Sequence, residues 1–214
     1  MKFAYCYAGG NMPAIKEFDI ESTANVEKGQ VVCADGNVIT EKVKNAKLIG
    51  VCEETHKGVE DMLNARSNGT KIRVNVTDGV YETEAVKLVA KNGCTGTSFV
   101  CDADGLSEAC VGGVLVLVEK ADGSTNTEKA GKVRKITGYS VSGNVATVTA
   151  ENGEVPYVGD VYALIPALGA ELCLDENKTG YSFNNTNTDV ELRCVGFDID
   201  RAKVYVKLEN TIFA

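Results

Sequence analysis

The chain contains one histidine, His56, and a cysteine four residues before it, Cys52. Such a pair could make a nucleophile, because an imidazole can take the thiol proton and leave a reactive thiolate. This spacing brings two side chains to one face only in a helix, whereas residues 48–52 have the composition of a strand. We therefore expect a surface histidine beside a core cysteine. One histidine also excludes a metal site built from several.

A second candidate is Asp102-Ala103-Asp104-Gly105, whose carboxylate spacing resembles the opening of a calcium-binding loop. An EF-hand requires a bidentate glutamate at the twelfth position of its loop, and Gly113 occupies that position here. No helix pattern flanks the segment, and a hairpin turn explains the same residues. We predict no metal and no cofactor, although a loosely bound cation stays open.

Two motifs of serine enzymes are incomplete. Lys178-Thr179-Gly180 matches one motif of the penicillin-recognising enzymes, but the Ser-x-x-Lys motif that supplies their nucleophile is absent from the sequence. Residues 138–142 (Gly-Tyr-Ser-Val-Ser) lack the last glycine of a nucleophile elbow. Neither G-x-G-x-x-G nor a P-loop occurs. The inventory predicts a protein that is not an enzyme, and a cysteine- or carboxylate-based enzyme ranks last among the alternatives.

Charge and hydropathy limit the classes of partner that the chain is expected to bind. Thirty acidic residues against 22 basic ones give a net charge of −8, and no basic cluster is interleaved with aromatic residues, so we predict no nucleic-acid partner. The most apolar stretch, residues 111–118, contains two glycines and has the length of a strand, so we predict no membrane partner. The N-terminus has no signal-peptide core, which predicts synthesis in a cytoplasm.

Eight cysteines are present, and no C-x-x-C motif occurs among them. Their even number permits a disulfide framework or a zinc site. Without an export signal, buried free thiols are the favoured interpretation. The positions are 6, 33, 52, 94, 101, 110, 173 and 194.

The elements that must position these residues are predicted by seven Asx-Gly dipeptides, which favour tight turns between strands. They begin at residues 35, 68, 78, 92, 104, 122 and 152, and most are flanked by runs rich in Val, Ile and Thr. The pattern predicts an all-β fold, a mainly antiparallel barrel or sandwich with at most one or two short helices. Residues 58–66 are the helix candidate, from their apolar spacing.

Two hairpins are predicted in particular. A two-residue loop at Asp78-Gly79 would pair Val76 with Tyr81 and place Arg73 opposite Glu84, a complementary pair of charges. A second hairpin is expected around residues 142–144, between two alternating runs. Residues 181–188, rich in Asn and Thr, are expected to form an exposed loop.

Composition divides the chain into four parts. Residues 1–20 form an N-terminal arm or strand, residues 21–120 a β-barrel domain, residues 121–131 a polar linker or long loop, and residues 132–214 a second β module. In the first part Phe3, Tyr5 and Tyr7 alternate onto one face before a break that contains Met12. These four are the candidate inter-subunit binding residues, although the strand could instead complete the chain's own sheet.

The order of short motifs between residues 26 and 120 resembles the small β-barrel decoration (cement) proteins of tailed bacteriophage heads. The motifs are Lys28-Gly29-Gln30-Val31-Val32, Asp35-Gly36, Leu48-Ile49-Gly50-Val51, residues 69–74, residues 79–82, residues 96–100 and residues 102–105. The resemblance implies a homotrimeric virion protein that is made in the host cytoplasm, binds the major capsid protein on the outer surface of the head and stabilises the capsid. A receptor- or glycan-binding β module of a phage tail or fibre is the alternative.

Overall fold

The computed structural model of the chain describes residues 3–5, 13–20, 24–35, 38–40, 47–57, 71–77, 79–122, 133–174, 181–183 and 192–209. Within these ranges the regular elements are strands, except for one turn of 3-10 helix, η1 (Glu108–Cys110). The all-β fold predicted from the turn residues is confirmed. The helix candidate at 58–66 lies outside the described residues.

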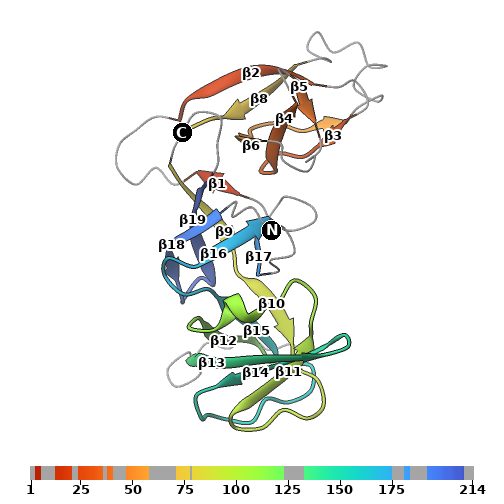
Figure 1. Cartoon of the computed structure of the whole chain (residues 1–214), viewed down its shortest axis with the longest axis vertical. Coiled ribbons are helices and arrows are strands. Elements are labelled where there is room, and N and C mark those ends of the chain that lie inside the picture. Colours follow the sequence, from red (N-terminus) through yellow and green to blue (C-terminus); the bar gives the residue numbers. More distant parts are fainter. Residues whose placement is uncertain are drawn as a thin grey trace.

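Five strands close into a barrel at one end of the longest axis (Figure 1). Around the barrel they are β2 (Ile15–Ile20), β5 (Val38–Thr40), β4 (Val31–Asp35), β6 (Lys47–Cys52) and β8 (Lys71–Asn75). The pair β2–β5 is parallel and the other neighbours are antiparallel. Alternation along β8 turns Ile72 and Val74 inward and Lys71 and Arg73 outward, as a strand with one buried face requires. A short pair, β3 (Asn25–Val26) and β7 (His56–Lys57), accompanies the barrel.

Two six-stranded sheets follow along the same axis within the described residues (Figure 1). The middle sheet has the order β1 (Ala4–Tyr5), β9 (Val80–Glu84), β19 (Lys203–Leu208), β18 (Leu192–Asp198), β16 (Glu171–Leu174), β17 (Tyr181–Ser182). The distal sheet has the order β10 (Val86–Val89), β15 (Val161–Ile165), β12 (Val114–Glu119), β13 (Val133–Ser142), β14 (Val145–Ala150), β11 (Ser98–Asp102).

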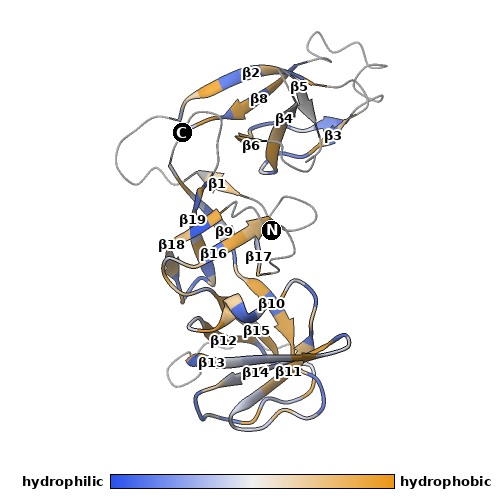
Figure 2. Ribbon diagram, viewed as in Figure 1, coloured by the Kyte–Doolittle hydropathy of each residue, from blue (hydrophilic) through white to orange (hydrophobic). Residues whose placement is uncertain are grey.

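The middle and distal sheets share one hydrophobic core, whereas the barrel interior is a separate and smaller one. In Figure 2 the apolar colouring lies mainly along strands. Strands β4 and β6 are buried on both faces: Val32 and Ile49 belong to the barrel interior, and Val31 and Val51 belong to the shared core. Residues 31–34 of β4 and 48–52 of β6 are accordingly non-polar without alternation.

Strand pairing crosses the boundary expected at residues 121–131. In the distal sheet β12 pairs with β13, with Val114 opposite Lys135. In the middle sheet β9 pairs with β19, with Tyr81 opposite Val206. Each of these pairs joins the segment 21–120 to the segment 132–214. The expected linker thus lies between two neighbouring strands of one sheet, and of its residues the structure describes 121 and 122.

The hairpin predicted at Asp78-Gly79 is wrong. Strand β8 lies between β2 and β6, and strand β9 lies between β1 and β19, so both edges of each strand are already paired. Arg73 stands opposite Glu17, and Glu84 stands opposite Lys203. The chain passes here from the barrel to the middle sheet, and the backbone groups of each strand are paired at both edges by other strands, which leaves no free edge for pairing across the turn.

The hairpin predicted around residues 142–144 is confirmed. Ser142 pairs with Val145 across a two-residue turn in which Gly143 has a φ of +60°. Positive φ at the first central position is the geometry of a type II′ turn, whose twist matches the flanking strands. Turn chemistry predicted this pairing because both partners are adjacent in the sequence.

Tyr181 links the middle sheet to the distal sheet through hydrogen bonds of its hydroxyl group. It lies in β17 with 1% of its surface exposed, and its hydroxyl donates to the Leu164 carbonyl (2.8 Å) and accepts from the Val86 N–H (3.2 Å). Its ring packs edge-on against Phe183, also 1% exposed, at 5.5 Å between centroids. The exposed loop predicted at 181–188 is therefore wrong for these two residues, which the shared core buries; residues 184–188 lie outside the described ranges.

Tyr181→Phe is expected to lower the free energy of unfolding by about 1–3 kcal/mol, because it leaves the partly buried Val86 N–H and the buried Leu164 carbonyl without their hydroxyl partner. Urea denaturation measures the change. Thr83→Val serves as a control in which removal of a buried hydroxyl should have the opposite effect on stability. The Thr83 hydroxyl is fully buried and has no hydrogen-bond partner within the described part of the chain. Its removal should raise the unfolding free energy by about 1 kcal/mol. An equal loss of unfolding free energy in both variants would contradict the stabilising role of the Tyr181 hydroxyl.

Candidate functional site

The N-terminal candidates lie against the chain's own middle sheet as far as the structure describes them. Phe3 is 3% exposed, belongs to the shared core and donates its N–H to the Gly29 carbonyl at 2.9 Å. Tyr5 forms a strand pair with Tyr81. Tyr7 and Met12 lie outside the described residues. In this conformation Phe3 contributes to the chain's own core, so a role at a neighbouring subunit stays a prediction.

The surroundings of Cys52 hold its thiol in the neutral form. Burial raises the pKa of the Cys52 thiol far above its usual value, and the negative charges of Glu54 and Glu53 raise it further. The reactive thiolate is therefore disfavoured. His56 is 5% exposed, so the expectation of a surface histidine is wrong: strand β7 carries it beneath the surface through its pairing with β3.

The remaining cysteines behave as core residues. The seven cysteines in the described ranges are free, and six of them are buried; Cys6 lies outside these ranges. The prediction of buried free thiols is confirmed for six of them, and the seventh, Cys94, is free and half-buried. Burial raises the pKa of Cys101 to about 12, with Asp102 adding to the rise, and burial raises the pKa of Cys110 to about 11.

Because the pKa values of these thiols are raised in the folded chain, we expect the free energy of unfolding to fall in alkali. Below about pH 9 both thiols are neutral in the folded and unfolded chains, so they add no pH dependence. Between about pH 9 and the folded pKa values of about 11 and 12, the unfolded chain ionises while the folded chain does not, and the free energy of unfolding falls. Urea midpoints at pH 8, 9 and 10 should fall in that order, less steeply in Cys101→Ala. Equal midpoints would contradict the prediction.

The calcium-like segment is a turn. Gly105 has a φ of +67°, and the Asp102 carboxylate forms an ion pair with Lys91. Within the described ranges, no group of three or more His, Cys, Asp or Glu residues could hold a metal ion. The described residues likewise contain no helix that is long and apolar enough to cross a bilayer.

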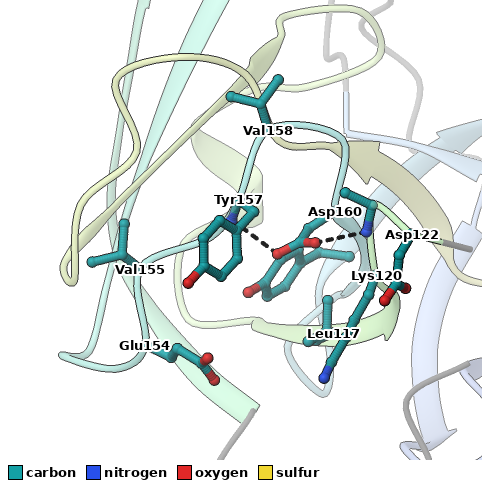
Figure 3. Close-up of a pocket in the computed structure, with 10 residues that line it drawn as sticks. Leu117, Lys120, Asp122, Glu154, Val155, Tyr157, Val158 and Asp160 are labelled. Carbon is teal, nitrogen blue, oxygen red and sulfur yellow. Dashed lines mark hydrogen bonds between the residues drawn. The ribbon is translucent and has the colours of Figure 1, made fainter. Parts of the chain in front are cut away.

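A pocket of about 640 Å³ opens on the distal sheet beside residues 154–160, which we call the Tyr157 loop (Figure 3). Its floor comes from strands β12 and β15, through Leu117 and Tyr162. Its volume falls within the range of about 300–1,000 Å³ that is typical of ligand sites. The other lining residues are Lys120, Ala121, Asp122, Glu154, Val155, Tyr157, Val158 and Asp160.

Asp160 fixes the loop from one side. Its carboxylate accepts hydrogen bonds from the backbone N–H groups of Tyr157 and Ala121, each at 2.9 Å, and these are the dashed lines of Figure 3. The Asp160 N–H donates back to the Tyr157 carbonyl at 3.0 Å, and the Asp160 carbonyl accepts from Ala90 at 2.8 Å. With 5% of its surface exposed, Asp160 acts as a buried brace.

Arg134 fixes the loop from beneath. This residue of β13 is 4% exposed, and its guanidinium donates to the Gly96 carbonyl at 3.2 Å and to the Glu154 carbonyl. It also lies 6.0 Å from the centroid of the Tyr162 ring, within the range of a cation–π contact. Both ends of the Tyr157 loop are therefore held by buried charged groups.

The fixed backbone presents apolar side chains to solvent. Val155, Tyr157 and Val158 are 53%, 72% and 56% exposed, whereas Pro156 between them is buried. Our sequence reasoning missed this loop. Its signal is a run of large apolar residues in a turn bounded by Pro156 and Gly159, where a solvated loop usually carries polar residues.

Two polar side chains of the pocket, Tyr162 and Asp160, interact with groups of the chain itself. Burial raises the pKa of the Tyr162 hydroxyl, and the nearby Arg134 charge opposes that rise. The Asp160 carboxylate is occupied by backbone donors. No family model, curated protein or solved structure matches the chain.

Proposed function

We propose that the protein is a capsid decoration subunit, which binds the outer surface of an assembled phage head through the Tyr157 loop and stabilises it. One observation carries the proposal: three large apolar side chains are exposed on a loop that two buried charged residues, Asp160 and Arg134, hold in place. The motif resemblance supplies the kind of partner, the major capsid protein.

A loop of this kind suits docking. Contiguous exposed apolar groups on a soluble protein mark interaction sites, and aromatic residues are frequent anchors of protein interfaces. Association normally costs free energy to order loops and side chains. Because the backbone of the Tyr157 loop is already fixed, most of that cost is met on folding, and the apolar burial contributes to affinity.

The stabilising effect follows from linkage. A subunit that binds the assembled shell and not its dispersed components shifts the equilibrium toward the shell. Association as a trimer would let three loops engage neighbouring capsid subunits together, so that modest single-site affinities give high avidity. The virion surface is the corresponding location.

Co-sedimentation with emptied phage heads tests the proposal. The protein should saturate in fixed proportion to capsid subunits, and bound heads should resist heat or urea longer. Tyr157→Ser should weaken binding at least tenfold, since interface anchors are worth about 2 kcal/mol or more. Leu168→Ser, at a site with a similar 69% exposure, is the matched control and should bind normally. An absence of saturable binding to heads overturns the proposal.

A glycan-binding module of a tail or fibre is the second candidate. It is favoured by the exposed Tyr157, which lines the same pocket as Glu154 and Asp122. In a chain without tryptophan, an exposed tyrosine such as Tyr157 can serve as a stacking platform. Binding to host cells or glycans, combined with no binding to heads, would favour this candidate.

A further inference from the structure

Strand β13 leaves part of one edge without a neighbouring strand. On one side β14 pairs with it as far as the turn, where Ser142 stands opposite Val145. On the other side β12 pairs only with residues 133–135, and the backbone of residues 112–113 adds hydrogen bonds to Ile136. Beyond Ile136 this second edge has no strand beside it within the described part of the chain (Figure 1).

The register of the hairpin determines which backbone groups point to this open edge. The two-residue turn makes Ser142 and Val145 a hydrogen-bonded pair, and such pairs alternate along an antiparallel ladder. The N–H and C=O groups of Tyr139 and Val141 therefore point away from β14. Among the described residues these groups have no hydrogen-bond partner. Ser140 is exposed and Val141 is 55% exposed, so solvent reaches this part of the strand.

The open edge lacks the features that usually prevent strand pairing. Exposed edges of natural sheets carry charged residues or proline, or a bulge turns them away. Residues 136–150 contain neither a charged residue nor a proline, although 24% of the residues in the chain are charged. The register shift between Ile136 and Gly138 comes before the open part and leaves the rest of the strand regular. The edge is therefore suited to the addition of a further strand.

We propose that the open edge of β13 pairs with the same edge of a second copy of the chain, antiparallel and about a two-fold axis at Ser140. In this register Tyr139 of each copy stands opposite Val141 of the other, and the outward N–H and C=O groups of both residues bind each other. An aromatic and a β-branched side chain then form a cross-strand pair, which stabilises sheets. The neutral edge favours a second copy as the occupant, because identical charged edges would repel each other.

This contact is isologous and joins two copies. It cannot by itself build the trimer that the motif resemblance implies, and on a decorated head it would join neighbouring decoration subunits. The inference does not rest on the proposed function, because the edge and its register belong to the free protein. The contact is small, so association in solution should be weak, and a surface that holds many copies would strengthen it.

Cysteine substitutions along β13 test the register in the free protein. In the two-fold pair the two copies of Ser140 face each other with Cα atoms about 4.5 Å apart, a separation that a disulfide can bridge. Ser140→Cys should therefore give a covalent dimer when oxidised glutathione accepts the two electrons of the thiols. Ser142→Cys, at an exposed position of the same strand, is the matched control, because its two copies would lie about 13 Å apart. The unmodified chain under the same oxidant controls for the native cysteines.

NMR spectra at increasing protein concentration measure the association without a cross-link. The signals of residues 138–142 should shift up to millimolar concentration, and Val141→Lys should weaken the association at least about tenfold, since a charge on an edge opposes pairing. Val145→Lys is the matched control and should associate like the wild type. Val145 is also exposed, but its side chain lies on the opposite face of the hairpin and its backbone groups are paired with β13.

The two measurements together decide the proposal. Concentration-dependent shifts at residues 138–142 with a covalent dimer from Ser140→Cys alone support it. Equal yields of dimer from Ser140→Cys and Ser142→Cys overturn the two-fold register. An absence of concentration-dependent shifts at residues 138–142 overturns the pairing of the edge, and shifts confined to the Tyr157 loop overturn it in favour of association through that loop.

Discussion

Gly50→Ala is expected to unfold the barrel while the distal sheet stays folded. An ideal Cβ at this position would lie 2.0 Å from the carbonyl oxygen of Asn75 and 2.9 Å from its carbonyl carbon. Real Cβ atoms do not approach backbone atoms this closely, so the backbone of strand β8 would have to move away from β6. The barrel closes through that contact, where Val51 pairs with Asn75.

The expected loss of unfolding free energy in Gly50→Ala is large compared with the stability of the barrel. Gly50 lies at an irregularity of β6, where the register with β4 shifts, and glycine at such a bulge allows close approach of a second backbone. Among the described residues the separate barrel core has eight buried members, far fewer than the shared core, so the stability of the barrel on its own is expected to be modest. A backbone clash at this point belongs to the mechanisms that cost more than about 4 kcal/mol.

Hydrogen exchange followed by mass spectrometry measures the outcome by segment. Amides of β4, β6 and β8 should exchange fast in Gly50→Ala, while those of β12 to β15 stay protected. Gly138→Ala is the matched control, because its Cβ would meet Thr149 at an ordinary 3.4 Å. Protection of the barrel at its wild-type level would show that β6 and β8 tolerate a side chain here.

The strands of this fold could be predicted, but their partners could not. Turn residues and alternation predicted the all-β class and the hairpin at Gly143, because both depend on neighbouring residues. The pairing of β9 with β19 joins residues more than 100 positions apart, and the hydrogen bond from the Val86 N–H to the Tyr181 hydroxyl spans 95 positions. Such pairs are chosen by the packing of the shared core, which no local pattern contains.

The same limit explains why the Tyr157 loop was missed. From the sequence alone, one would expect Asp160 and Arg134 to be exposed, since charged residues are rarely buried. Their burial follows from backbone partners that lie far along the chain, at Ala121 and Gly96. The N-terminal aromatic residues attracted attention through their alternation, but Phe3 proved to be a core residue.

Asp160→Asn is expected to release the Tyr157 loop and with it the docking surface. The carboxylate now accepts two backbone N–H groups, one on each oxygen. An amide of the same shape keeps one acceptor and turns an NH₂ group toward the other donor. The variant loses a charge-assisted hydrogen bond and places two hydrogen-bond donors against each other. Together these two effects should destabilise the fixed conformation of the loop by about 2–4 kcal/mol.

Two measurements separate loop release from general unfolding in this variant. Hydrogen exchange should rise at residues 154–160 and at Ala121 while strand β14 stays protected, and head binding should fall at least tenfold although Tyr157 itself is unchanged. Glu108→Gln removes an exposed carboxylate and should alter neither measurement. Fast exchange of the loop with undiminished head binding would show that the exposed side chains suffice without a fixed backbone. Rigid presentation by Asp160 would then have no part in docking, and the affinity would come from apolar contact alone.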